Sequence, residues 1–485
     1  MGSEKKRKSG AKKKRKKIDQ PCIPSSLERF VYALERADEG VTGHVGLLLG
    51  IEAFHALGLA EACRRELRLK ERRRGPTEGE WVEVFVMMML AGGTNLEDIE
   101  VLKQDDGLCR VWDIPRRVSA RSALDFLLRF HDPSLEMSSP GQAVIPPETP
   151  GLEGLGRVNA HLLAEVQRRR RVEVATLDFD ASIHPCDKKE ALPAYEHGRA
   201  YQPVVGYWQE QRLIVHDEFR DGNVPAGMGN LPFVQAALGK LPEGISKVRV
   251  RADSALYDHR LLRYLDREGH EFAISADMSR ELRAAIVALP QSAWARLAPR
   301  DGSYAKEEKW WAEVSFVPGD LVARKGERPF RYLVIRLPER PVQLDLFEAP
   351  PETRYVAIVT NRDLPGPELI HWQREKCGTI EQVHDRLKHD VGARLFPSSR
   401  FGANAAWYRL STLTFNLYEA LKLLALPKEW ANDRLPSSRF RLINRAGRVL
   451  RHARRYIVVL SQVALPLVAT LIEARGILHS ILESG

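Results

Sequence analysis

The sequence is poor in cysteine and has no long apolar run. Its 485 residues include five cysteines, and no two of them form a Cys-x-x-Cys pair. This scatter argues against a disulfide framework or a structural zinc site and favours a reducing compartment. No uninterrupted apolar run reaches the roughly 18 residues that a membrane-spanning helix needs. The lysine-rich N-terminus is not followed by an apolar segment, so we expect neither a transmembrane helix nor a secretory signal.

Basic charge is concentrated in two acid-free segments. The formal net charge is +10; residues 5–17 hold ten Lys or Arg, and residues 434–455 hold eight Arg. Subtracting both segments (10 − 10 − 8) leaves about −8 for the rest of the chain. Such local concentration suits contacts with phosphate groups better than a general role in solubility.

Each basic segment has a second interpretation. We expect residues 1–20 to be a disordered tail, although a targeting signal or an added leader beginning Met-Gly-Ser would have the same composition. Residues 426–485 are predicted to be an Arg-rich region that contacts DNA, although the arginines could also coat a solvated helix. The arginines expected to contact DNA there are Arg441, Arg445, Arg448, Arg451, Arg454 and Arg455.

The order of helical and strand patterns predicts an α/β protein with an all-helical N-terminal part. Three strand patterns, a helix, a strand, a helix, a strand and a helix follow residue 171, which is the order of a ribonuclease-H-like mixed sheet flanked by helices. A second group of alternating segments predicts a small β insertion domain. The expected divisions are a helical domain for DNA binding or dimerisation at 21–135, a linker and helix at 136–170, the ribonuclease-H-like domain at 171–299 and 357–425, and the β insertion at 300–356.

Three carboxylates fall at matching places in this predicted sheet. The strand VATLDFDAS, residues 174–182, carries Asp180 to its C-terminal end, Asp253 follows the fourth strand, and Glu381 lies on the last helix. The first and fourth strands are neighbours in this topology, so we expect the three acids to converge. Taken singly, Asp253 could simply cap a helix, and Glu381 could be an ordinary surface acid.

Converging carboxylates repel one another and need cations. Hard oxygen ligands favour Mg²⁺, with Mn²⁺ as an alternative, and two such ions can activate a water or a 3′-hydroxyl against a phosphodiester. Asp178 shares the strand face of Asp180 and is a further candidate ligand. His384 and His389 would suit a softer metal, but their helix is very polar.

Several segments together resemble the DDE transposases of bacterial insertion sequences, most closely the 1380 family, which is related to piggyBac-type enzymes. The resemblance covers most of residues 40–460 and is carried by AGGTNLEDIEVLKQD, LDFDAS, the GNVP loop, VRADSALYD, REKCGTIEQVHDRLK and RFGANAAW. It implies that Asp180, Asp253 and Glu381 are the catalytic acids. Asp180 fits the first motif better than Asp178, because it is followed by a small residue and a hydroxyl.

The resemblance also places two cations on the helix that carries Glu381. Lys388 matches the lysine seven residues after the glutamate in the family's YxxRxxxExxxxxxK signature. The signature's tyrosine and arginine are replaced by Arg374 and Cys377, so Arg374 becomes the candidate cation one turn further upstream. Both cations are expected to contact DNA phosphates.

The expected function is therefore a cut-and-paste DNA transposase. It would bind terminal inverted repeats, cleave at element ends and transfer 3′-hydroxyl ends into target DNA, as a homodimer in the bacterial cytoplasm, associated with the nucleoid and with no membrane partner. Two alternatives remain open: a ribonuclease-H-like nuclease that does not join strands, and a domesticated DNA-binding protein that has lost catalysis. The presence of all three acids argues against the latter.

Overall fold

The computed structural model describes most of the chain. The described residues are 39–70, 75–135, 142–195, 198–300, 308–321, 329–337, 353–460 and 465–484. The predicted basic tail at 1–20 and the beginning of the predicted helical domain lie outside these ranges.

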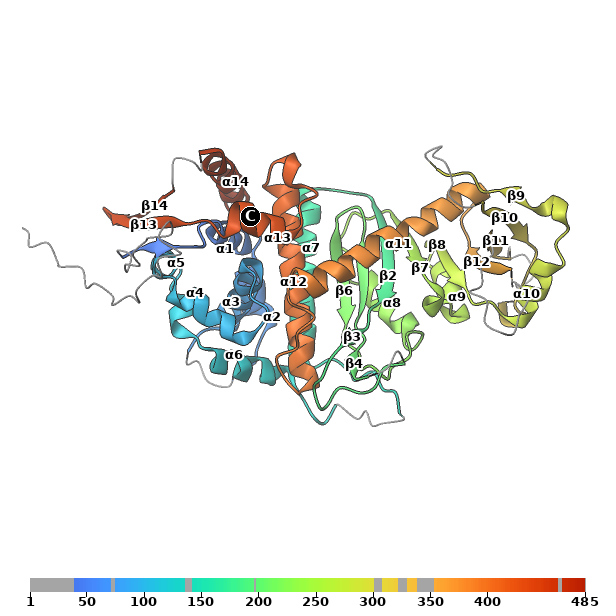
Figure 1. Ribbon diagram of the computed structural model, residues 1–485, viewed down its shortest axis with the longest axis horizontal. Helices are drawn as coiled ribbons and strands as arrows, with labels where there is room; N and C mark the ends of the chain where they lie inside the picture. Colours follow the sequence, from blue (N-terminus) through green and yellow to red (C-terminus); the bar gives the residue numbers. More distant parts are fainter. Residues whose placement is uncertain are drawn as a thin grey trace, which may run out of the picture.

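A large mixed sheet lies at the centre of the described residues, flanked by helices (Figure 1). The strand order is β6-β5-β2-β7-β8-β12-β11-β10-β9, with β2, β7 and β8 parallel to one another and every other pair antiparallel. The predicted α/β class with a mixed sheet is thus confirmed. The strands are β2 (Val174–Ala181), β5 (Val204–Trp208), β6 (Leu213–Glu218), β7 (Lys247–Ala252), β8 (Glu271–Ala276), β9 (Ala295–Arg296), β10 (Trp310–Val314), β11 (Arg331–Leu337) and β12 (Arg354–Thr360).

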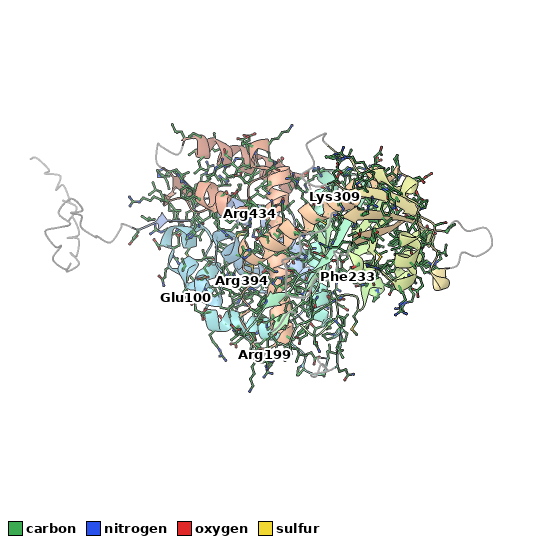
Figure 2. The ribbon with its side chains drawn as sticks, turned by 45° about the vertical axis from the view of Figure 1, so that its right-hand side comes forward. Glu100, Arg199, Phe233, Lys309, Arg394 and Arg434 are labelled. Atoms are coloured by element: carbon green, nitrogen blue, oxygen red, sulfur yellow. The ribbon has the colours of Figure 1, made fainter. Side chains whose placement is uncertain are left out.

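Strand β2 lies between β5 and β7 in the interior of the sheet. Its apolar residues Ala175, Leu177 and Phe179 are fully buried on one face. Phe179 packs edge-on against Phe233, labelled in Figure 2, with ring centroids 5.8 Å apart. Phe233 belongs to α8 (Asn230–Leu238), which therefore covers this face. The alternation of VATLDFDAS places its acids on the opposite face.

The segment predicted to be a small β insertion domain, 300–356, supplies strands to the same sheet. Strands β10, β11 and β12 continue the central sheet, because β12 pairs antiparallel with the edge of β8 from Ala357 opposite Ala276 to Thr360 opposite Ala273. Pairing satisfies backbone groups that β8 would otherwise leave exposed at an open edge. The segment VQLDLFEAPPE, expected between two of these strands, lies outside the described residues.

Two long helices connect the sheet to the rest of the protein. Helix α11 (Gly366–His389) crosses the sheet face that carries the acids and contacts β2, β7, β8 and β10 (Figure 1). Helix α12 (Phe401–Leu424) is buried on nearly all sides between the sheet and the N-terminal helices. Helix α7 (Pro150–Arg169) packs against α12, and the side chain of Thr149 caps it by accepting a hydrogen bond from Leu152 N.

The N-terminal part is a helical unit built around α3. The run Met87 to Met89 on α3 is buried and packs in the core. Thr77 and Glu80 form a reciprocal cap at the start of α3, so backbone donors that the helix leaves unpaired are satisfied. The helices are α1 (Leu47–Ala56), α2 (Leu59–Glu66), α3 (Glu78–Ala91), α4 (Ile99–Gln104), α5 (Asp106–Val111) and α6 (Ala120–Leu127).

The Arg-rich C-terminal region folds back onto this helical unit. After the short helix α13 (Leu435–Ser438), the strands β13 (Gly447–His452) and β14 (Arg455–Val459) form a hairpin that extends from the body (Figure 1). Strand β13 pairs with β1 (Val41–Thr42) of the N-terminal part. Arg448, Arg451, Arg454 and Arg455 are therefore presented on a β-hairpin rather than on a solvated helix.

The last helix, α14 (Leu465–Glu483), packs on α1. By length and composition alone it could cross a membrane, which the apolar-run count from the sequence did not anticipate. In the structure it buries Leu471, Ala474 and Leu478 against the protein. Arg475 Nε on this helix lies 2.7 Å from Glu52 Oε1 of α1. These contacts attach one side of the helix to α1, and 17% of its apolar window is buried in the structure.

Candidate active site

Two of the predicted acids lie side by side at the C-terminal ends of two neighbouring strands. Strands β2 and β7 are parallel, with Asp178 opposite Arg251 and Phe179 opposite Ala252. Continuing this register places Asp180 beside Asp253, where both strands end. The main-chain N–H of Ala255 donates to Asp253 Oδ1 at 3.1 Å, so Asp253 also starts the short 3₁₀ turn Ser254–Leu256. The capping role and the site role are therefore compatible.

Helix α11 places a lysine and a histidine against this pair. Lys376 Nζ donates to Asp180 Oδ1 at 3.2 Å and lies 4.0 Å from Asp253 Oδ2. His384 Nε2 lies 3.5 Å from Asp180 Oδ2. Lys376 and His384 are 4% and 5% exposed. Both carboxylates are thus held against a buried cationic group.

The two acids differ in their electrostatic environment. Burial opposes ionisation of Asp180, but His384 and the charge of Lys376 hold the pKa of Asp180 below its ordinary value. Burial raises the pKa of Asp253, which Lys376 partly offsets and the neighbouring Asp180 reinforces. Two carboxylates this close cannot both ionise freely without a cation, so the pair is a site for positive charge.

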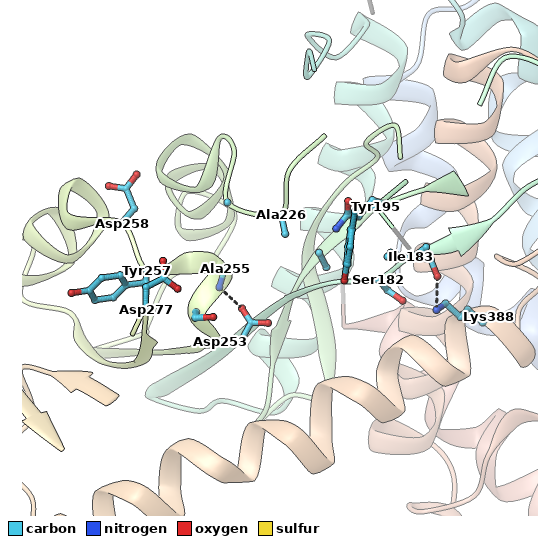
Figure 3. A pocket seen from close by; sticks show the side chains of 14 residues that line it. Ser182, Ile183, Tyr195, Ala226, Asp253, Ala255, Tyr257, Asp258, Asp277 and Lys388 are labelled. Atoms are coloured by element: carbon cyan, nitrogen blue, oxygen red, sulfur yellow. Dashed lines mark hydrogen bonds between the residues drawn. The ribbon is translucent and has the colours of Figure 1, made fainter. Parts of the chain in front are cut away.

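An open cleft of about 720 Å³ lies next to this pair and is lined by Asp253 (Figure 3). Its wall includes Ser182, Asp253, Tyr257, Asp277 and Lys388. The side chain of Asp253 is 48% exposed, whereas that of Asp180 is 17% exposed and lies beneath it against α11. A substrate in the cleft would therefore meet Asp253 before Asp180.

Three residues of α11, Lys376, Ile380 and His384, are buried at four-residue intervals. Glu381 lies on the same helix, three residues before His384. Its side chain is exposed. Among the described residues, no three His, Cys, Asp or Glu side chains are already arranged to hold a metal ion. The structure therefore brings Asp180 and Asp253 together. The side chain of Glu381, on α11, faces solvent instead.

Asp178 is occupied by another partner. It is fully buried, and both of its oxygens accept hydrogen bonds from Arg251, at 2.7 Å to Oδ1 and 2.8 Å to Oδ2. Arg251 also donates to Trp372 O at 2.7 Å and to Glu375 Oε2 at 3.0 Å. This ion pair ties β2 and β7 to α11, and it uses the lone pairs that a metal ion would need.

The cations expected on α11 lie in different surroundings. Lys388 Nζ donates to Ile183 O at 2.8 Å, just beyond β2, and lines the cleft (Figure 3). Arg374 is half-buried, and within the described residues its Nε is buried with no hydrogen-bond partner. Of these two cations, Lys388 is therefore the one that lines the cleft.

The C-terminal arginines divide into anchored and exposed groups. Arg441 donates to Asp433 Oδ2 at 2.6 Å and stacks 4.3 Å from the Trp430 ring centroid, while Arg445 is half-buried and donates to Phe440 O at 3.4 Å. The hairpin carries four exposed arginines: Arg448, Arg451, Arg454 and Arg455.

Arg434 belongs to the same acid-free segment but has a structural role. Labelled in Figure 2, it pairs with Asp385 at 2.7 Å and with Asp390 at 2.7 Å, and so fixes the end of α11.

Sequence reasoning missed Lys376 and Arg251 as partners of the acids. A helical signal was available for Lys376, because positions 376, 380 and 384 follow one another at four-residue intervals and so lie on one side of a helix with the apolar Ile380. No comparable signal existed for Arg251, whose contact with Asp178 spans 73 residues.

The donor atoms at the pair suit a hard divalent cation. Asp180 and Asp253 supply carboxylate oxygens, which are ligands that hard divalent cations prefer. The ammonium of Lys376 lies within 4.0 Å of both acids, so a positive charge is already held between them. These side chains therefore fit a site for Mg²⁺ or Mn²⁺ formed by the two acids, with room for further ligands from the open cleft.

Comparison with known proteins gives one family. The model of the family described as transposase DDE domain group 1 matches residues 33–478. Among curated protein sequences no match was found. A cryo-EM structure of the piggyBac transposase synaptic complex with hairpin DNA is similar at 11% sequence identity, covering 92% of this chain and 83% of that chain, with a TM-score of 0.42.

Proposed function

Because the chain belongs to the transposase family with a group 1 DDE domain, we propose that it is a cut-and-paste transposase whose first two catalytic acids are Asp180 and Asp253. The family resemblance drawn from the sequence motifs is confirmed at this level, and DDE transposases act on DNA with divalent metal ions. The observation that carries the proposal is the convergence of the two family acids, 73 residues apart, at the end of parallel strands beneath an open cleft. The order of the first five strands, β6-β5-β2-β7-β8, supports a ribonuclease-H-like centre.

In this proposal Asp180 and Asp253 hold a divalent cation, and Glu381 supplies the third carboxylate. A bound divalent cation would supply Lewis-acid activation of a water or a 3′-hydroxyl and stabilisation of the leaving oxygen. Glu381 starts from an exposed position on α11, so its side chain must turn towards the acid pair. Asp178 forms a buried ion pair with Arg251, which supports Asp180 as the first of the three catalytic acids.

The remaining parts of the chain are assigned by charge and position. Lys388, which lines the cleft, contacts a phosphate of the DNA strand being cut, and Arg374 remains the second candidate for that role. The hairpin β13–β14 contacts backbone phosphates through its exposed arginines. The N-terminal helices recognise element ends or join two copies of the chain as a homodimer.

A strand-transfer assay tests this proposal. Purified protein is incubated with labelled DNA of the element ends, a target plasmid and Mg²⁺. Joined products are expected. Cleavage without joining would replace the proposal with a nuclease, and a gel shift without cleavage would replace it with a DNA-binding protein.

A further inference from the structure

Lys376 occupies an unusual position in the candidate site. Its ammonium lies 3.2 Å from Asp180 and 4.0 Å from Asp253, and the side chain is 6% exposed. Burying an ammonium is costly unless carboxylates face it, so the two acids determine where this side chain lies. In return, the lysine reduces the repulsion between the two carboxylates.

Lys376 Nζ faces Asp180 Oδ1 and Asp253 Oδ2, and a divalent cation held by both acids would compete with it for this position. A metal ion held by Asp180 and Asp253 would lie within a few ångströms of the ammonium, and like charges at that separation repel strongly in a partly buried site. His384 closes the other side of Asp180, because its Nε2 lies 3.5 Å from Oδ2. The ammonium is therefore the group that a metal ion must replace.

We propose that Lys376 is an internal counter-ion, which holds Asp180 and Asp253 together in the metal-free protein and withdraws from them when a divalent cation binds. The inference rests on the proposed function, because it takes the acid pair to be the metal site. Lys376 is a positioning residue in this account: it acts through the two carboxylates and needs no contact with DNA.

Metal affinity tests the inference directly. Free Mn²⁺ is titrated by electron paramagnetic resonance in the presence of the full chain, without DNA. The Lys376→Met substitution removes a cation that competes for the same oxygens. The Mn²⁺ dissociation constant of this variant should therefore be at least about tenfold lower than that of the parent. An unchanged or weaker affinity would overturn the inference.

A matched control separates this effect from the general loss of a buried lysine. Lys422 on α12 is also 4% exposed, and its Nζ lies 2.8 Å from Glu419 Oε1, away from the acid pair. The Lys422→Met substitution removes the same charge and should leave the Mn²⁺ affinity unchanged. Equal tightening in both variants would show an effect of net charge and would contradict the inference.

Withdrawal of the lysine can be followed in the unaltered protein, so the test does not depend on the variants folding. Lysine acylation followed by peptide mass mapping should label Lys376 poorly without metal and more strongly with Mn²⁺. Equal protection in both conditions would contradict withdrawal. If the protein binds Mn²⁺ and cuts DNA while both readouts at Lys376 stay flat, the inference alone fails. If it binds no Mn²⁺, the proposed metal site fails with it.

Discussion

The two acids of β2 can be separated by the way each substitution fails. Asp178→Asn keeps the shape of the side chain but removes the charge that faces the fully buried Arg251. Breaking one partner of a buried ion pair costs about 3–5 kcal/mol, because the other charge is left uncompensated. Glu375 Oε2 remains 3.0 Å from Arg251, so we expect a loss near the lower end, about 3 kcal/mol.

Asp180→Asn should behave in the opposite way. Lys376 retains Asp253 at 4.0 Å after the substitution. The expected loss is that of one hydrogen bond between charged groups, about 1.5–3 kcal/mol. Metal-dependent cleavage should disappear, because a neutral amide is a weaker ligand than a carboxylate.

Both variants are measured by urea unfolding at pH 7 and by cleavage of end DNA in Mg²⁺, at a temperature where each is folded. Asp178→Asn is expected to be unstable but to cleave when folded, and Asp180→Asn to be stable but inactive. The reasoning is refuted if Asp178→Asn is as stable as the parent and cannot cleave while Asp180→Asn cleaves normally.

Two further variants test the hairpin and the buried histidine of β6. Replacing the four exposed hairpin arginines (Arg448, Arg451, Arg454 and Arg455) with Ala should weaken binding to any DNA sequence. The slope of log K against log salt concentration should flatten by about 0.9 for each phosphate that the variant no longer neutralises. An unchanged slope in a filter-binding series would exclude the hairpin from the interface. Burial and the nearby Lys240 hold the pKa of His216 well below its ordinary value, so the unfolded chain takes up a proton that the folded protein does not. Stability should therefore fall as the pH drops below about 6.5, by up to about 1.4 kcal/mol per pH unit from this group, and His216→Gln should reduce that slope in urea unfolding between pH 7 and 5. Parallel pH profiles for parent and variant would contradict this assignment.

The acid pair could be predicted from the sequence because its position follows from local patterns. The alternation in VATLDFDAS fixes which face of β2 carries Asp180, and the buried run before Asp253 predicts a parallel neighbour. Once the two strands pair in parallel, their ends coincide. The family motifs pointed to the same two residues.

The features that the sequence did not predict depend on contacts between residues far apart in the chain. Alternation predicts that residues 310–314 and 331–337 are strands, but it does not say that they extend the central sheet through β12. A carboxylate two residues before another looks equivalent to it in sequence. Only the position of Arg251 on β7 shows that Asp178 is engaged in an ion pair.

The central claim is that Asp180, Asp253 and Glu381 form one metal-dependent catalytic centre. Its most direct test is cleavage of labelled end DNA in Mg²⁺ by the parent, Asp253→Asn and Glu381→Gln, with DNA binding measured on the same samples. We predict cleavage by the parent that chelation of the metal abolishes, and no cleavage by either variant, although both still bind the ends. Retained cleavage in Asp253→Asn or Glu381→Gln would contradict the assignment of that residue, and cleavage by the parent without metal would contradict the centre itself.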